Sequence, residues 1–267
     1  MTLPEEALAS AAYPLCLDPA VSAEVALDQS MTLETSSGDQ YFPRAAWGLT
    51  NYLVVWDDTR AGTWSDSGAD IFGARVSSSG QLLDPAGLEI CFRPEPQRMP
   101  SVCWMSNAFL VVWEDARNGN NFAIYGARFT DGGSTLDADG FPISSSTNNR
   151  SQLYPCVAAG AGQSLVVWSD SRANSSDIYG RLVAVNGQPV GAADVVICSY
   201  SNQQLYPAAA WGATNFLVAW EDYRDEQGWG YTKVYGARVS REGSLMDTSS
   251  LPLCGYWGIY VRSPPLA

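Results

Sequence analysis

The sequence predicts an all-β protein built from four-stranded antiparallel sheets, and three observations lead to this fold class. A unit of roughly fifty residues occurs four times along the 267-residue chain. Each unit contains short apolar runs of strand length, separated by turns rich in Gly, Pro, Asn and Ser. Helix-forming segments are almost confined to residues 5–12 and 21–27, and neither has a strong helical period.

The first strand of each unit begins near a proline, and a tryptophan follows thirteen residues later in every copy. That tryptophan closes an apolar run such as Leu110 to Trp113, and it is followed by an aspartate two residues on and an arginine four residues on. The four copies of this W-x-D-x-R motif are Trp56, Asp58 and Arg60; Trp113, Asp115 and Arg117; Trp168, Asp170 and Arg172; and Trp220, Asp222 and Arg224. A group present in every unit serves a need that every unit has, so we interpret the aspartate as a turn cap that pairs with a nearby arginine.

Two further strands follow the tryptophan in each unit. The next one ends in Ile-Tyr-Gly or a close variant, and three of the four copies continue as Ala-Arg. In the third copy the arginine, Arg181, comes one place early, which points it to the opposite face of the strand. A glycine turn then leads to a terminal strand that ends at Cys91, Ser144, Cys198 or Cys254.

The Leu-Val-Val-Trp runs are apolar at consecutive positions, so both faces of these strands must be covered. Four-stranded sheets that stack as blades around an axis provide this cover and explain the period, which predicts a β-propeller. We predict an N-terminal extension at residues 1–40, which could contribute a closing or exchanged strand, and a propeller at residues 41–267. Its repeats cover about 41–96, 97–150, 151–203 and 204–254, with a tail at 255–267.

Four clear copies predict four blades, and five blades stay open as an alternative. Residues 13–16, Tyr-Pro-Leu-Cys, look like the end of a further repeat, and residues 255–267 follow the last complete copy. The chain ends could complete a blade together or exchange a strand with another molecule.

These motifs resemble the bacterial extracellular β-propeller repeats that carry F-L-V-V-W-E-D-x-R followed by I-Y-G-A-R. The resemblance covers roughly residues 41–254. It implies a propeller fold and an extracellular or cell-surface location, and it implies no particular reaction.

Composition restricts the partners. The net charge is −13 and Lys233 is the only lysine, so a nucleic acid would meet a repulsive surface. No apolar run has the length of a transmembrane helix. The six cysteines lack C-x-x-C spacing, which favours disulfides over zinc. We therefore expect no metal or other cofactor, although the acidic surface would tolerate Ca²⁺.

The absence of histidine excludes histidine-based catalytic groups and zinc sites. Carboxylate pairs remain, namely Asp57 with Asp58, Glu114 with Asp115, and Glu221 with Asp222. Because such pairs recur around the chain, whereas an active site is singular, we predict that the protein is not an enzyme.

Two long insertions carry the candidate binding residues. They separate the second and third strands of the first and fourth copies, which become neighbours if four blades close into a ring. Exposed aromatic side chains beside polar groups are suited to stacking on sugars or anchoring a protein. The candidate ligand-binding residues are Trp64, Asp66, Tyr223, Trp229 and Tyr231.

The leading hypothesis is an acidic, secreted, non-enzymatic binding or adhesion module that recognises carbohydrate or protein through these loops. The alternative is a self-assembling structural subunit of a surface layer, sheath or filament joined through the chain ends. The third hypothesis is a glycan-active enzyme that uses an Asp/Glu pair.

Overall fold

The computed structural model describes residues 38–60, 68–119, 121–145, 150–173, 175–224 and 232–254. In these ranges the chain forms sixteen β-strands and no helix. Accordingly, no helix there is long and apolar enough to cross a membrane. The prediction of an all-β fold is confirmed.

The strands form four antiparallel four-stranded sheets, and each sheet is one repeat in chain order. Blade 1 contains β1 (Gln40–Trp47), β2 (Asn51–Asp58), β3 (Asp70–Ser77) and β4 (Leu88–Cys91). Blade 2 contains β5 (Gln97–Trp104), β6 (Phe109–Asp115), β7 (Ala123–Phe129) and β8 (Phe141–Pro142). Blade 3 contains β9 (Gln152–Gly160), β10 (Gln163–Asp170), β11 (Asp177–Ala184) and β12 (Val195–Cys198). Blade 4 contains β13 (Gln204–Trp211), β14 (Asn215–Asp222), β15 (Lys233–Ser240) and β16 (Leu251–Pro252).

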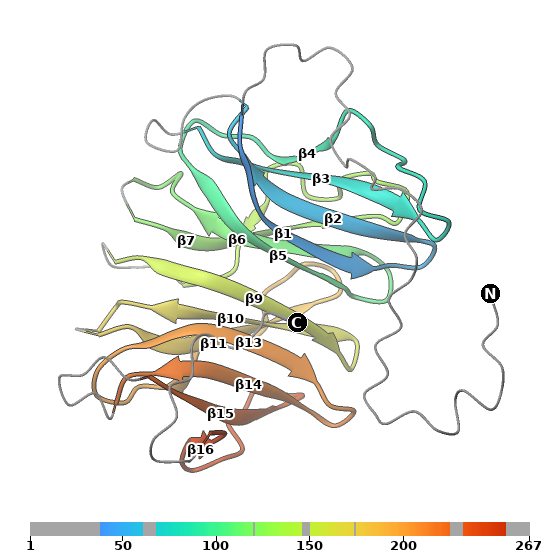
Figure 1. The fold of residues 1–267 in the computed structure, drawn as a ribbon. Helices are drawn as coiled ribbons and strands as arrows, with labels where there is room; N and C mark the ends of the chain where they lie inside the picture. The colour runs from blue at the N-terminus through green and yellow to red at the C-terminus, as the bar shows by residue number, and fades with distance from the viewer. Residues whose placement is uncertain are drawn as a thin grey trace, which may run out of the picture.

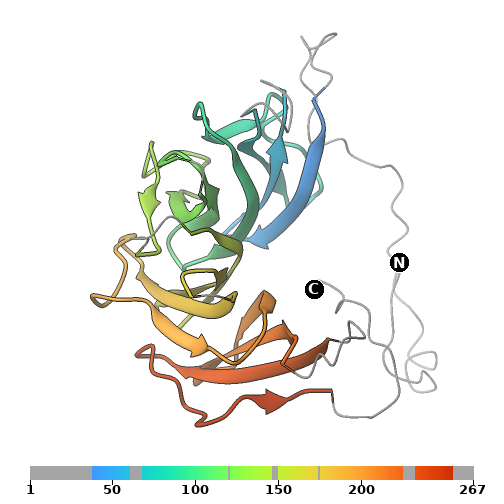
Figure 2. The ribbon, with the colours of Figure 1, turned by 90° about the vertical axis from the view of Figure 1, so that its left-hand side faces the viewer.

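The four blades follow one another in an arc around a common axis (Figures 1 and 2). The first strand of each blade is innermost, and β1 packs on β5, β5 on β9, and β9 on β13. Within the described ranges, β1 and β13 do not pack together in the way that the innermost strands of successive blades do. The expectation that blades 1 and 4 are neighbours is therefore not met in this part of the chain.

Alternation along each second strand supplies the two faces that the blades bury. In β2, Leu53 and Val55 point forward to the next blade and share one core cluster with Phe109, Val111 and Trp113 of β6. Equivalent clusters join blade 2 to blade 3 and blade 3 to blade 4. Continuous apolar strands are thus needed because both faces of a blade are covered.

The W-x-D-x-R motif builds the corner where the second strand ends. Trp113 Nε1 donates a hydrogen bond to Asp115 Oδ2 over 2.8 Å, and Arg117 Nη2 donates to the same oxygen over 2.6 Å. The Arg117 guanidinium also stacks on the ring of Tyr125, 4.2 Å from its centroid. The other three blades repeat the indole and guanidinium contacts to their own aspartates, Asp58, Asp170 and Asp222.

The arginine of the third strand has a separate role. In blades 1, 2 and 4 it pairs with an aspartate of the following turn, and the pairs are Arg75–Asp84, Arg128–Asp137 and Arg238–Asp247. In blade 3 the displaced Arg181 instead reaches Asp194, which also pairs with Arg172. The one-residue shift therefore gives this arginine a different partner.

The cysteines do not meet the expectation of a disulfide in the described part of the chain. Cys91, Cys103, Cys156, Cys198 and Cys254 are all free thiols. The sixth cysteine, Cys16, lies outside the described residues.

Candidate functional site

Every innermost strand has a β-bulge at its proline, and the residue before that proline has a left-handed backbone. The φ values are 54° at Phe42, 55° at Met99, 58° at Tyr154 and 53° at Tyr206. The ladder register shifts at the same place in all four sheets. A non-glycine residue pays for this conformation with strain, and a bulge redirects backbone groups and side chains. The four bulges thus mark one end of the innermost strands as a specialised region.

The carboxylate pairs noted in the sequence are divided between the two faces of each blade. Their second members, such as Asp115, belong to the tryptophan corner described above. Their first members lie on the opposite face, where the next blade covers Asp57 and Glu114 completely. The adjacent pairs are therefore not functional pairs, and the structure regroups carboxyl groups across the boundaries between blades.

Glu114 is held beneath the bulge of blade 3. Its Oε1 accepts a hydrogen bond of 2.6 Å from the Tyr154 amide, and its Oε2 accepts one of 2.7 Å from Arg98 Nε. Burial raises the pKa of Glu114, while Arg98 and the Tyr154 amide act in the opposite direction. The left-handed turn at Tyr154 therefore aims a backbone donor at this carboxylate.

Asp57 occupies the equivalent place beneath the bulge of blade 2, but neither of its oxygens has a hydrogen-bond partner. Burial raises the pKa of Asp57 to about 8, and the charge of Glu114 adds to the effect. The Met99 backbone lowers this pKa without reaching hydrogen-bond geometry, and Arg98 and Arg44 lower it as well. Asp57 is thus a protonated carboxyl group at neutral pH, coupled to Glu114 of the next blade.

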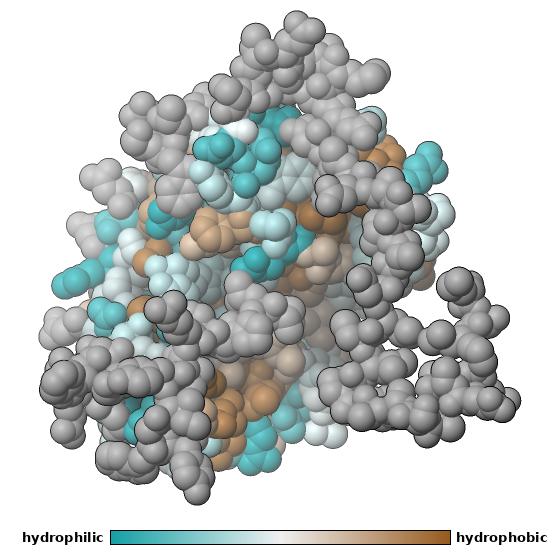
Figure 3. Space-filling view, viewed as in Figure 1, coloured by the Kyte–Doolittle hydropathy of each residue, from teal (hydrophilic) through white to brown (hydrophobic). Residues whose placement is uncertain are grey.

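Two tyrosines adjoin this pair. The rings of Tyr154 and Tyr206 have centroids 4.3 Å apart, and Tyr206 is 45% exposed. Burial, followed by hydrogen bonding with Tyr206, raises the pKa of Tyr154 to about 12. Because the Tyr154 amide binds Glu114, the aromatic pair is tied to the carboxylate. In the view of Figure 3, which is that of Figure 1, apolar residues gather along the innermost strands between hydrophilic patches.

The candidate binding residues from the sequence are mostly not described by the structure. Trp64, Asp66, Trp229 and Tyr231 lie outside the described residues. Tyr223 is half-buried, and its amide donates a hydrogen bond of 2.9 Å to the Gln203 carbonyl.

The sequence analysis missed the cross-blade pair of Asp57 and Glu114. The available signal was the residue directly after each motif tryptophan, which is Asp, Glu, Ser or Glu and so varies more than the rest of the motif.

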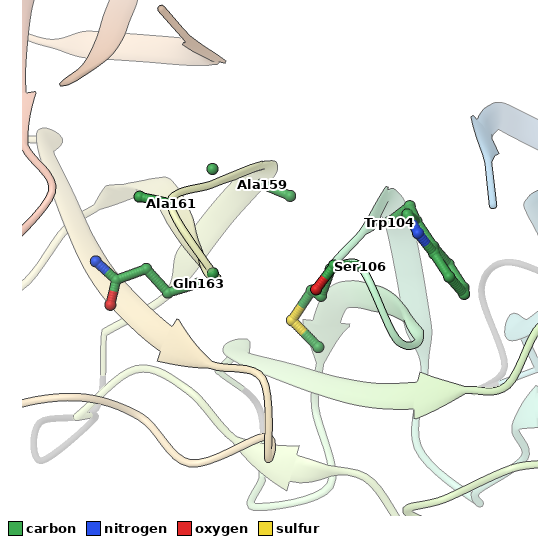
Figure 4. Close-up of a pocket in the computed structure, with 8 residues that line it drawn as sticks. Trp104, Ser106, Ala159, Ala161 and Gln163 are labelled. Carbon is green, nitrogen blue, oxygen red and sulfur yellow. The ribbon is translucent and has the colours of Figure 1, made fainter. Parts of the chain in front are cut away.

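A pocket of about 380 Å³ lies at the opposite end of the innermost strands, between the hairpin turns of blades 2 and 3 (Figure 4). Its lining residues include Trp104, Ser106, Ala159, Ala161 and Gln163, and none of the eight is ionisable. Within the described ranges, no group of three or more Cys, Asp or Glu residues is arranged to hold a metal ion. The carboxyl pair is therefore the stronger candidate for chemistry.

No family model matches the sequence, and no curated protein matches it significantly. Solved structures do match the fold. A thermostable family-43 glycoside hydrolase gives a TM-score of 0.53 at 12% identity, over 85% of this chain and 79% of that one. An α-L-arabinofuranosidase from Podospora anserina, in complex with cellotriose, gives 0.50 at 11% identity over 82% and 70%.

A neuraminidase-like protein of a flat-faced bat isolate from Peru gives a TM-score of 0.53 at 9% identity. That match covers 79% of this chain but 52% of the other, so the chain spans about half of the neuraminidase-like protein's length. At these identities the likeness establishes a shared architecture. The protein is a β-propeller with four described blades of four antiparallel strands.

The comparisons contradict the hypothesis of a non-enzymatic binding or adhesion module and the expectation that the chain is not an enzyme, because similar propellers are glycoside hydrolases. The same matches contradict the alternative hypothesis of a structural subunit of a surface layer, sheath or filament. The error was to treat the carboxylates as equivalent in every blade. Asp58 and its counterparts are equivalent, whereas Asp57 and Glu114 form a single coupled pair.

Proposed function

We propose that the protein is a glycan-active enzyme, a propeller glycoside hydrolase in which Asp57 and Glu114 are the two reacting carboxyl groups. The observation that carries this proposal is the buried Asp57 carboxyl, which has no hydrogen-bond partner, a pKa of about 8, and Glu114 as a charged neighbour. Two carboxyl groups whose environments differ are what acid-catalysed hydrolysis of a glycosidic bond requires.

Asp57 is suited to be the general acid, since it retains its proton at neutral pH and has no partner to give up. It donates that proton to the oxygen of the leaving sugar as the glycosidic bond breaks. Glu114, held in place by Arg98 and the Tyr154 amide, is suited to act on the other side of the anomeric carbon. It either accepts a proton from the attacking water or attacks the carbon itself, and the configuration of the first product distinguishes these two routes.

Both carboxyl groups are covered in this structure, so substrate must displace the side chains above them. Tyr154 and Tyr206 provide the aromatic surface on which a sugar ring can stack during this step. The prediction that Trp64, Asp66, Tyr223, Trp229 and Tyr231 contact carbohydrate stays a prediction, now as part of substrate binding. The extracellular location and repeat family implied by the resemblance fit an enzyme that acts on polysaccharide outside the cell.

The test is a screen of aryl glycosides and plant polysaccharides with the intact protein, beginning with 4-nitrophenyl α-L-arabinofuranoside. Asp57→Asn and Glu114→Gln are each expected to lower kcat at least about a hundredfold, the usual range for loss of a positioned acid or base. The matched control is Asp139→Asn, which removes an exposed carboxylate that pairs with Arg93 at the surface. No turnover of any glycan by the folded wild type, or equal activity in all three variants, would overturn the proposal.

A further inference from the structure

Blade 4 exposes an apolar face whose equivalents in blades 1 to 3 are buried against the next blade. Leu53, Leu110, Leu165 and Leu217 are equivalent residues of the second strands. The first three pack on the blade that follows their own, and Leu217 lies on the corresponding face of blade 4. The first three are 0–1% exposed, whereas Leu217 is 41% exposed. The face of blade 4 therefore has the composition of a buried interface without the cover that the equivalent faces have.

The terminal strand shows the same difference. Ile90, Ile143 and Ile197 are 0–4% exposed, and their counterpart in blade 4, Leu253, is 47% exposed. Leu217 and Leu253 thus lie at corresponding places on one unpartnered face. Exposed apolar surface of this kind marks a contact site.

A buried carboxylate lies on this same face. Glu221 holds the position of Asp57 and Glu114, it is 8% exposed, and it has no polar partner among the described residues. In the earlier blades the next innermost strand approaches this acid, because the Tyr154 amide binds Glu114 and the Arg98 charge acts on Asp57. The occupant of the blade 4 face should accordingly present an arginine and a bulged strand.

Residues 261–267 place an arginine two residues before a proline, as β5 does with Arg98 and Pro100. The prolines of the innermost strands are separated by 57, 55 and 52 residues, and Pro264 follows Pro207 by another 57. In this register Arg262 aligns with Arg98, and Leu266 aligns with Val102 and Ala209. Val102 packs in the core cluster that contains Leu53, and Ala209 packs against the cluster that contains Leu165.

We propose that residues 261–267 dock on the open face of blade 4 as the innermost strand of a fifth blade position. Leu266 covers Leu217 there, and the guanidinium of Arg262 pairs with Glu221. The apolar part of this contact corresponds to the packing of Val102 in β5 with Leu53 of blade 1, and the ion pair with Glu221 is additional to it. The contact closes the apolar face with a segment of this chain and is independent of glycan hydrolysis.

The test is cross-linking in the full-length protein that carries Leu217→Cys together with Leu266→Cys. Mild oxidation is expected to join the two introduced thiols within one monomer, as shown by peptide mapping. A positive control is Leu165→Cys with Ala209→Cys, the corresponding pair between blades 3 and 4. A negative control is Leu136→Cys with Leu266→Cys, since Leu136 is an exposed apolar residue of blade 2, away from this face.

Adding Arg262→Glu to the test pair should lower the yield of the cross-link several-fold, because it sets two negative charges together. A disulfide between two molecules would assign the face to a second copy and overturn the proposal. No disulfide, with the thiol at position 217 as reactive to maleimide as the one at position 136, would also overturn it.

Discussion

Asp57 and Asp115 are both fully buried aspartates at the ends of second strands, yet their surroundings assign them opposite properties. Asp115 accepts hydrogen bonds from the Trp113 indole and the Arg117 guanidinium. Asp57 faces the next blade and has no such donor. The direction in which a side chain leaves the strand thus decides whether a carboxyl group stabilises the blade or stays available for chemistry.

The pKa of Asp57 makes stability depend on pH. Its folded pKa of about 8 is above the ordinary value, so between these limits the folded protein holds a proton that the unfolded chain releases. The contribution of Asp57 to stability is therefore fully present below about pH 4 and is lost as the pH rises toward 8. Asp70 and Asp177, with pKa values raised by burial to about 7 and about 6, add to the same trend.

Replacement of Asp57 by asparagine should remove part of this trend. We expect Asp57→Asn to unfold at a higher temperature than the wild type at pH 8 and to differ little from it at pH 4. Each unit of pKa shift corresponds to about 1.4 kcal/mol, so the effect is measurable by thermal or urea unfolding. A variant with the same pH slope as the wild type would contradict the assignment, and Asp139→Asn serves as the surface control.

Replacement of Asp115 should have the opposite effect. Asp115→Ala leaves the Trp113 indole and the partly buried Arg117 without their acceptor, so we expect a loss of about 3 kcal/mol. Urea unfolding measures this loss. A change below about 0.5 kcal/mol would show that the tryptophan corner contributes little.

The position of each innermost strand can be predicted from the sequence, but its bulge cannot. The constant spacing from proline to tryptophan predicts the strand, its place in each repeat and its buried neighbours. It does not predict the left-handed φ at Met99 or Tyr154, since neither residue favours that conformation and the bulge depends on packing against the next blade. For the same reason the coupled carboxyl pair could not be read from the sequence, where its members lie 57 residues apart.

Two equivalent glycines at the end of the innermost strands, Gly160 and Gly212, differ in how closely a neighbouring side chain packs against them. A Cβ placed on Gly160 would overlap the indole ring of Trp211 in blade 4, whereas one on Gly212, at the same repeat position, would meet nothing closer than 3.6 Å. We expect Gly160→Ala to destabilise the protein by about 1–3 kcal/mol and Gly212→Ala to have little effect. Equal unfolding midpoints for the two variants would contradict the packing between blades 3 and 4.

At the scale of the whole molecule, four similar blades form an arc that carries a large negative charge. The net charge is −13, and most ion pairs near the corners are partly buried, for example Arg224–Asp222 with 10% and 0% side-chain exposure. Salt screens the repulsion among exposed carboxylates more than it weakens such pairs. We therefore expect the melting temperature at pH 8 to rise between about 0.05 M and 0.5 M NaCl, and a fall would show that exposed ion pairs dominate.

The sequence predicted the fold class and blade pattern because the repeat constrains every unit in the same way. The proposed function depends on departures from the repeat, such as aspartate at position 57, glutamate at 114 and serine at 169. Those departures acquire meaning only when adjacent blades bring them together.

The pH dependence of kcat/KM for a glycan substrate, measured for the wild type and Asp57→Asn, shows whether Asp57 is the general acid. We predict that wild-type turnover falls above about pH 8 as the general acid loses its proton, and that the asparagine variant loses turnover across the whole range. Turnover that persists unchanged through this pH, or an Asp57→Asn variant as active as the wild type, would contradict the assignment of Asp57 and with it the cross-blade active centre.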